Sequence, residues 1–445
     1  MMSDSPSCSG ARPWRQGDDL PIIRVKYSLS TLQYNEMEGK RMSKQVALEE
    51  FRASTKTWLE GNFPKTLVGS AMGLEGEADD SMKADFELWR QRLADKGWGA
   101  PTWPAEFGGA GIGHPEAKII SQEMGKMGAF NPIPLMAGMG VTMVGPTLLE
   151  YGTDEQKAKH LRGMASGETR WCLGLSEPGA GSDLASLITK AEDDGDTYKL
   201  NGQKTWTSGA DISQWCGALV RTDSNAKKRD GISFVMLPMA QDGVSTKPIR
   251  LISGASPFCD TFFDNAQAEK SDLLGPLNEG WSVVKRLLQH ERQSQTQARG
   301  PGGSTKKPSF QQIAKDYVGV DDSGALADGD LRVRLIDHLM DSEAHGLTVN
   351  RITAEARGKV EVSAAASILK NSATKIAQGK AELTMELMGS QGVGWEGDNY
   401  TKEELDNVQD WLWGKAISIY GGSFEVQNNI ISKNILGLPE NTQKG

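Results

Sequence analysis

Histidine and cysteine are scarce in this sequence, and their spacing argues against metal chemistry. The 445 residues include five histidines and four cysteines. Cys8, Cys172, Cys216 and Cys259 form no CxxC pair, and no HExxH motif occurs. Because zinc sites and disulfide frameworks depend on such spacings, we expect neither a metal site nor a disulfide. Four isolated thiols are typical of a reducing, cytoplasmic setting.

Long hydrophobic runs and a surplus of basic residues are also missing. No stretch approaches about 18 apolar residues, so we expect no membrane span. Lys and Arg number 49 against 58 Asp and Glu, which gives a formal charge of −9. An acidic chain without a basic stripe argues against nucleic acid as a partner. The residue in surplus is glycine, with 51 copies, which is above the usual share of about 7%.

The pattern along the chain changes twice, from helical to strand-like and back to helical. Residues 1–42 have no apolar h-region and are expected to form an irregular arm. Helical signals follow over 43–168, short runs of strand formers over 169–275, and helical spacing again over 276–440, with an atypical loop at 300–329. The sequence therefore predicts an α+β fold with an N-terminal helical domain, a middle antiparallel β-domain and a C-terminal domain of the four-helix type.

Two segments of the predicted β-domain carry groups that could hold a ligand. Ser176–Asp183 combines hydroxyl groups with glycines, which let a backbone approach a flat ring or a phosphate. Asn201-Gly202 predicts a type I′ hairpin turn, after which Trp206 and Ser208 would point to one side of a strand. Taken alone, an ordinary glycine-rich turn explains the first segment equally well. A core tryptophan likewise explains the second.

Together with three further segments, these motifs resemble the acyl-CoA dehydrogenases over roughly residues 43–440. The matching segments are PAEFGG at 104–109, YGTDEQK at 151–157, SEPGAGSD at 176–183, NGQKTWTS at 201–208 and MGSQG at 388–392. Their order and spacing also agree with the family. The resemblance implies the three-domain fold of that family, FAD as cofactor and an acyl-CoA thioester as substrate.

The resemblance also implies roles for individual residues. Those implied to contact FAD within the chain are Leu173, Leu175, Ser176, Gly181, Ser182, Trp206, Thr207, Ser208, Ser423 and Glu425. Those implied to reach the FAD of a neighbouring subunit are Glu386, Gly389 and Ser390, and those implied to contact substrate are Ser182, His290, Arg292 and Gly422. Two features depart from the family. A glutamine is usual at the Glu386 position, where a carboxylate would repel a pyrophosphate, and no Arg-x-x-Phe-Gly motif occurs between Gly300 and Arg357.

The catalytic base that many family members carry in a Tyr-Glu-Gly-Thr turn is absent. The matching turn begins Tyr420-Gly421, and a glycine cannot take a proton. The resemblance to isovaleryl- and long-chain-type enzymes implies that Glu291, on an earlier helix, is the base instead. Glu291 lies seven residues after Val284 and extends the apolar stripe of that helix, where burial would raise its pKa toward the range of a base. The alternative is a solvated Glu291, or one paired with Arg292.

Three functions remain open. The first is a FAD-dependent acyl-CoA dehydrogenase that oxidises the Cα–Cβ bond and passes electrons to an electron-transfer flavoprotein. The second is an acyl-CoA oxidase on the same scaffold. The third is a catalytically silent subunit, which the glycine at 421, the carboxylate at 386 and the missing arginine motif favour. We expect a homotetramer, or a heterotetramer with a related subunit. A base on the earlier helix leaves space beside Gly421 and Gly422 that suits branched, bulky or ring-bearing acyl groups.

Overall fold

The computed structural model describes residues 31–68, 80–133, 138–298, 308–355 and 365–439. The chain divides into two compact units, Met1–Phe51 and Arg52–Gly445. Helix α1 (Thr31–Asn62) begins in the first unit, so the expectation of an irregular arm up to residue 42 is wrong from Thr31 onward. The stretch contains no proline and is rich in Leu, Gln, Glu, Met and Lys, whose helix propensities are high.

The second unit contains the end of α1 and then a series of shorter helices. They are α2 (Lys83–Asp95), α3 (His114–Met127), α4 (Gly145–Tyr151) and α5 (Asp154–Ser166). Helix α5 begins at a capping box, in which the Thr153 hydroxyl accepts a hydrogen bond from the Gln156 amide and the Gln156 side chain accepts one from the Thr153 amide. Indole and phenyl rings form the core of this helical region, where Trp89 packs against Trp58 and Phe63.

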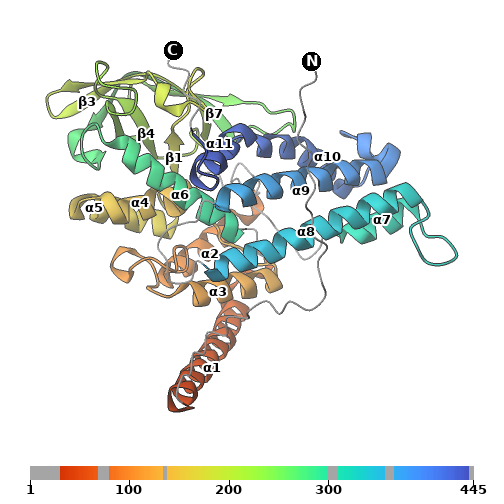
Figure 1. Cartoon of the computed structure of the whole chain (residues 1–445). Coiled ribbons are helices and arrows are strands. Elements are labelled where there is room, and N and C mark those ends of the chain that lie inside the picture. Colours follow the sequence, from red (N-terminus) through yellow and green to blue (C-terminus); the bar gives the residue numbers. More distant parts are fainter. Residues whose placement is uncertain (1–30, 69–79, 134–137, 299–307, 356–364, 440–445) are drawn as a thin grey trace, which may run out of the picture. The chain divides into compact units, whose positions relative to one another are not determined.

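An eight-stranded sheet follows the helices (Figure 1). Its strands are β1 (Trp171–Gly174), β2 (Lys190–Asp194), β3 (Thr197–Ser208), β4 (Trp215–Arg221), β5 (Ile232–Pro238), β6 (Val244–Ile249), β7 (Phe258–Glu269) and β8 (Leu273–Leu274). Their order is β6-β7-β3-β2-β4-β5-β8, with β1 paired to β4. Because β1 runs parallel to β4, the sheet is mixed and not purely antiparallel as expected.

The predicted hairpin turn at Asn201-Gly202 is wrong. Strand β3 continues through both residues. Its register with β7 shifts beside Asn201, but the extra residue is Asn265 of β7, whose φ is 57°, so the β-bulge lies in the partner strand. The tight turn lies one strand earlier, at Gly195, whose φ is 73°. It connects β2 to β3. The pairing of β3 with β7 continues through Asn201-Gly202, so the chain does not turn there.

Helices return after the sheet. They are α6 (Gly280–Ala298), α7 (Phe310–Val318), α8 (Gly329–Glu355), α9 (Ala365–Met388), α10 (Lys402–Gly414) and α11 (Phe424–Asn434). Helix α9 packs against α7, α8, α10 and α11, and Figure 1 shows α8 and α9 side by side. Helix α7 lies within the loop expected at 300–329. In the described part of the chain, no helix is long and apolar enough to cross a membrane.

One hydrophobic cluster joins the sheet to α6. Phe234 of β5, Leu173 of β1, and Val284 and Leu287 of α6 belong to it, and their exposure is at most 6%. Leu277, which is seven residues before Val284 and so matches its helical spacing in the sequence, precedes α6 and is 49% exposed. The cluster therefore packs α6 against the strands from the first turn of the helix onward.

The start of α6 lies so close to β5 that only glycine fits. A Cβ atom at Gly280 would come within 2.4 Å of the carbonyl carbon of Ser233 and 2.6 Å of the Phe234 amide nitrogen. We expect Gly280→Ala to lower the free energy of unfolding by about 1–3 kcal/mol, because backbone atoms cannot move aside cheaply. Gly329→Ala is the matched control, since Gly329 also begins a helix but has no heavy atom within 4 Å of its Cβ position. Equal urea midpoints for the two variants would contradict this packing.

A buried charge cluster attaches α5 to the end of the sheet. The Asp272 carboxylate lies 3.2 Å from His160 Nε2 and accepts a hydrogen bond of 2.8 Å from Lys159 Nζ. The His160 ring packs edge-on against Trp171 and Trp215. Burial alone would raise the pKa of Asp272, but the hydrogen bonds and charges of His160 and Lys159 lower it below its ordinary value.

The depressed pKa of Asp272 makes stability depend on pH. A carboxyl group with a lower pKa in the folded state contributes stability above its unfolded value of about 3.9, and that contribution is lost as the pH falls further through the folded value. We expect Asp272→Asn to cost about 1–3 kcal/mol at neutral pH. The difference from wild type should shrink as the pH falls below about 4. Asp193→Asn, which removes a surface pair with Lys270, is the control and should change little. A pH-independent loss for Asp272→Asn would contradict the assignment.

Candidate functional site

The Ser176–Asp183 loop leaves β1 and is held by a buried ion pair. Glu177 is 4% exposed, and its carboxylate accepts hydrogen bonds from Lys204 Nζ at 2.7 Å and from the amides of Ile188 and Thr189 at 2.7 and 2.9 Å. Lys204, on β3, is 0% exposed and also donates to the Leu175 carbonyl at 3.2 Å. Burial raises the pKa of Glu177, but Lys204 and the amide donors lower it further, so the carboxylate stays ionised.

The outer part of this loop is open. Ser176 is partly exposed, and Gly181 and Ser182 are exposed. A Cβ atom added at Gly179 or Gly181 would meet no heavy atom of the described residues within 4 Å. A flat or charged ligand could therefore approach the backbone here directly.

Strand β3 bulges where it passes the loop. The register with β7 shifts between Lys204 and Thr207, and Trp206 between them has a φ of 60°, which is uncommon for a residue with a side chain. The bulge turns Trp206 outward, so that the indole is 55% exposed, while Thr207 and Ser208 stay buried. Among the described residues, no group hydrogen-bonds the buried Thr207 hydroxyl. An exposed indole beside buried hydroxyls is a surface that a planar ring can cover.

A chain of aromatic contacts connects this bulge to the C-terminal helices. Trp206 meets Phe258 edge-to-face at 5.9 Å between ring centroids, and Phe258 stacks on Trp413 of α10 at 5.7 Å. Phe258 thus connects Trp206 of the bulge to Trp413 of α10, which lie 207 residues apart in the sequence.

Helix α6 presents Glu291 one turn beyond Leu287, on the face that Val284 and Leu287 bury. Glu291 is partly buried and has interactions within the protein. The preceding His290 is 9% exposed, and its Nε2 lies 3.4 Å from the Glu150 carboxylate of α4. The side chain of Arg292 lies outside the described residues.

Glu150 also fixes the turn of α6 that precedes Glu291. Its two carboxylate oxygens accept hydrogen bonds from Arg286 at 2.6 Å each. Arg286 lowers the pKa of Glu150 below its ordinary value, with a smaller contribution from His290. Helix α6 is therefore attached to α4 by charge as well as to the sheet by apolar packing.

The turn before α11 contains two glycines in a backbone conformation with positive φ. Gly421 and Gly422 have φ values of 67° and 92°, a region that disfavours side chains. Ser423 caps α11, because its hydroxyl accepts a hydrogen bond from the Val426 amide. The same hydroxyl lowers the pKa of Glu425, which lies exposed in the first turn of the helix.

Glu386 has a partner that the sequence pattern did not indicate. Arg334 of α8 donates two hydrogen bonds to its carboxylate, at 2.6 and 2.7 Å. This pairing lowers the pKa of Glu386 and balances its charge. Gly389 and Ser390 follow in an exposed turn, and the expected role of all three toward a neighbouring subunit stays a prediction.

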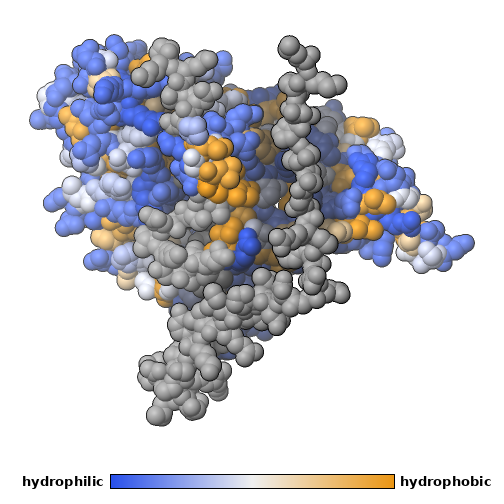
Figure 2. Space-filling model, viewed as in Figure 1, coloured by the Kyte–Doolittle hydropathy of each residue, from blue (hydrophilic) through white to orange (hydrophobic). Residues whose placement is uncertain are grey.

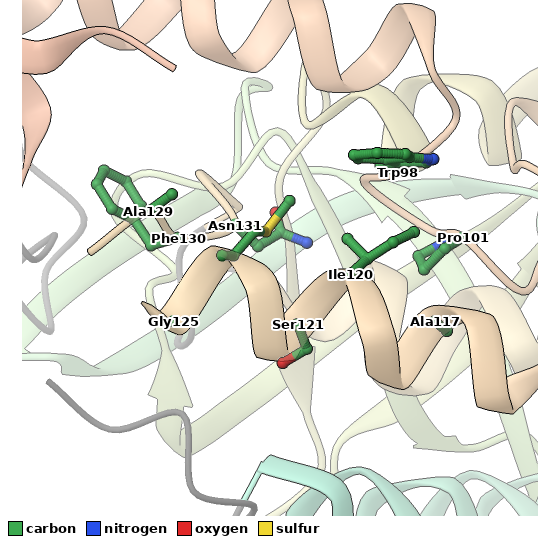
Figure 3. Close-up of a pocket in the computed structure, with 10 residues that line it drawn as sticks. Trp98, Pro101, Ala117, Ile120, Ser121, Gly125, Ala129, Phe130 and Asn131 are labelled. Carbon is green, nitrogen blue, oxygen red and sulfur yellow. The ribbon is translucent and has the colours of Figure 1, made fainter. Parts of the chain in front are cut away.

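A separate cavity lies within the helical part that precedes the sheet. Its volume is about 300 Å³, and Figure 3 shows Trp98 on one side and Ala117 and Ile120 of α3 on the other. None of the residues that the sequence singles out lines this cavity. Among the described residues, no group of three His, Cys, Asp or Glu side chains could hold a metal ion, and Cys172, Cys216 and Cys259 are buried free thiols.

Comparison with known proteins decides the family. Family models describing the N-terminal, middle and C-terminal domains of acyl-CoA dehydrogenases match residues 47–168, 172–266 and 278–436. The chain belongs to the acyl-CoA dehydrogenase family. It is thus an oxidoreductase of the acyl-CoA dehydrogenase type, and the family implies a flavin, which the open loop and the exposed Trp206 can accommodate.

Individual relatives cover nearly the whole chain. The acyl-CoA dehydrogenase IpdE1 of Mycobacterium tuberculosis is 33% identical over 400 residues, which span 88% of this chain and 98% of that protein. Among solved structures, the Tcur3481-Tcur3483 steroid ACAD is 29% identical with a TM-score of 0.70, covering 88% of this chain and 98% of its own. The ChsE4-ChsE5 complex from Mycobacterium tuberculosis is 26% identical with a TM-score of 0.67, over the same shares.

Two charged residues of the candidate site were assigned no role from the sequence. Glu177 lies in the Ser176–Asp183 segment and Lys204 in the segment 201–208. A signal was present for Lys204, since it lies an even number of residues after the buried Tyr198 and Leu200 on β3. A lysine on the buried face of a strand requires a partner.

Proposed function

We propose that the chain binds FAD and oxidises an acyl-CoA thioester to the trans-2-enoyl-CoA, with Glu291 as the base that takes the α proton. The observation that carries this proposal is the hydrophobic cluster that joins Leu173 and Leu175 of the flavin-binding segment to Val284, Leu287 and Leu288 of α6. It brings the helix of Glu291 to the strand that leads into the predicted flavin loop. Family membership supports the reaction class.

The protein's contribution to this chemistry is placement and a proton acceptor. The partly buried Glu291 accepts the α proton, and its pKa has to lie near the working pH for this role. FAD, when bound, accepts the β hydrogen as hydride. Ser176, Gly181, Thr207 and Ser208 would hold its ring, and Trp206 would cover one side. The attachment of α6 by Glu150 and Arg286 keeps the carboxylate in position while substrate enters.

The substrate we propose carries a bulky or ring-bearing acyl group. No side chain occupies the position of the missing base at Gly421, and the acyl group we propose would extend there. The neighbouring position is closed, since a Cβ atom at Gly422 would lie 2.6 Å from Gln427 Nε2. The name of one related structure, a steroid ACAD, points in the same direction. Ser182 and His290 are the described residues that we expect near the substrate, although His290 already pairs with Glu150.

The assembly we propose includes a second, related subunit. Two of the related structures are complexes of two different chains by name. Figure 2 shows hydrophobic side chains gathered over α11 on the face in view, and Ile419, Ile435, Leu436 and Leu438 are between 40% and 70% exposed. Such surface favours burial against a partner. Electron-transfer flavoprotein is the acceptor that we expect.

Anaerobic mixing with acyl-CoA thioesters tests the proposed function. The full chain, alone and co-expressed with related subunits encoded by the same genome, is supplied with FAD and mixed with straight, branched and ring-bearing acyl-CoAs. We expect ring-bearing substrates to bleach the flavin's visible absorbance most rapidly. Bleaching by short straight chains alone would contradict the bulky-substrate proposal, and no bleaching in any assembly would contradict the dehydrogenase itself.

A silent subunit is the second candidate, and Gly421 together with the Arg334–Glu386 pair favours it. Arg334 is engaged by a carboxylate of its own chain, and its charge is then balanced before any pyrophosphate arrives. A heteromer that loses all flavin reduction when only the partner's base is removed would support this reading. An oxidase would be distinguished by rapid re-oxidation of the bleached flavin in air.

A further inference from the structure

The Glu177–Lys204 ion pair links the two segments that we expect to hold the flavin. We define the flavin cradle as Ser176–Ser182 and Trp206–Ser208. Lys204 is the last residue of β3 before the bulge, and Glu177 is the second residue of the loop. The adjacent Thr205 amide donates to the Ser176 carbonyl at 2.9 Å, so the link has a backbone component as well.

The same carboxylate closes the far end of the loop. Glu177 accepts hydrogen bonds from the amides of Ile188 and Thr189, eleven and twelve residues further along the chain. Within the loop, Glu177 and Ala180 exchange two backbone hydrogen bonds of 3.0 Å each, which form a tight turn. One buried side chain thus determines where the loop begins and ends relative to β3.

A buried ion pair is a costly way to gain stability. Removing two charges from water is offset only when geometry and hydrogen bonds are nearly complete, and apolar residues of similar size often stabilise a protein as much. Here Lys204 and Glu177 are 0% and 4% exposed, and the carboxylate has three donors. Such a pair specifies one arrangement, because a loop displaced by a single residue would leave both charges buried without partners.

We infer that Glu177 and Lys204 are positioning residues that hold the flavin cradle in its binding arrangement before the cofactor arrives. This inference rests on the proposed FAD site. Neither residue needs to touch the flavin. Lys204 is fully buried and donates to Leu175 and Glu177, on either side of Ser176, and it precedes Trp206 by two residues on β3. Breaking the pair lowers the fraction of molecules with an ordered cradle, and the apparent FAD affinity falls by the same factor.

The test measures the FAD dissociation constant of the full chain in its native assembly, well below the melting temperature of each variant. Lys204→Met should raise the constant about tenfold or more, because Glu177 is left as a lone buried charge. The double variant Glu177→Gln with Lys204→Met removes both charges, and it should recover part of the affinity. Lys199→Met is the matched control, since it removes a surface pair with Asp194 from the same strand and should leave the constant within about twofold.

Amide hydrogen exchange of the flavin-free protein supplies the second readout. The amides of Ile188, Thr189 and Thr205 should lose protection in Lys204→Met and keep it in Lys199→Met. Unchanged FAD affinity in Lys204→Met, or a double variant no better than Lys204→Met alone, would overturn the inference while wild type still binds FAD. A wild-type assembly that binds no FAD would overturn the proposed function as well.

Discussion

Replacing Glu291 by glutamine should slow flavin reduction by acyl-CoA about 10²–10⁴-fold while FAD remains bound. Glutamine has nearly the same size and cannot accept the α proton, so the loss reports on the base and not on packing. The turn that holds the base in many relatives begins Tyr420-Gly421 here, and a glycine with a φ of 67° offers no substitute. Stopped-flow absorbance under anaerobic conditions measures the rate directly.

Glu279→Gln is the control for this substitution. Glu279 lies just before the same helix and is exposed, so the same chemical change there should leave the rate of flavin reduction close to that of wild type. Flavin reduction by Glu291→Gln at a rate near that of wild type would show that Glu291 is not the base. Loss of FAD from the variant would show a structural role for Glu291, and the visible spectrum of the purified protein reports it.

Phe234→Ala should produce the largest loss of stability, about 3–5 kcal/mol. The ring is 0% exposed in the cluster that joins β5 to α6, and a Cβ atom at Gly217 on the neighbouring strand would lie 2.6 Å from its Cζ. Removal of the ring leaves a cavity between strands and helix that rigid neighbours cannot fill. The variant's urea midpoint measures the loss, and its rate of flavin reduction should fall too, because α6 carries Glu291.

Ile252→Ala is the exposed counterpart of this change. Ile252 is 69% exposed in the same β-region, so its truncation should change the free energy of unfolding by less than about 0.5 kcal/mol. Similar midpoints for Phe234→Ala and Ile252→Ala would contradict the role of the cluster in holding α6 to the sheet.

The helical and strand-like regions could be predicted because the spacing of hydrophobic residues within each element is visible in the local sequence. Hydrophobic spacing identified α6, whose Val284 belongs to the buried cluster. Local signals failed where tertiary pairing decides. Asn201-Gly202 favours a hairpin turn locally, but its pairing with Asp264 and Phe263 of β7 keeps the chain extended. The parallel pairing of β1 with β4 likewise depends on residues more than 40 positions apart.

The sequence predicts the residues of the candidate site through its motifs, but it does not predict the ion pairs that hold those residues. The resemblance identified Ser176, Trp206 and Glu291 from residue type and order. It could not identify the contacts that hold them, because Lys204–Glu177, Arg286–Glu150 and Arg334–Glu386 each join segments at least 27 residues apart. These ion pairs depend on which side chains the fold brings together. From the sequence, the Glu386 carboxylate was expected to repel a pyrophosphate. In the fold, Arg334 supplies the charge that balances this carboxylate.

Deuterium exchange at the α carbon tests Glu291 as the base most directly. In a 3-thia-acyl-CoA, sulfur replaces the β carbon, so no hydride can leave, yet the α proton remains available to a base. We predict that the FAD-loaded assembly in D₂O exchanges the α protons of this analogue, as mass spectrometry would show, and that Glu291→Gln abolishes exchange while Glu279→Gln does not. Exchange by Glu291→Gln at a rate near that of wild type would contradict the account.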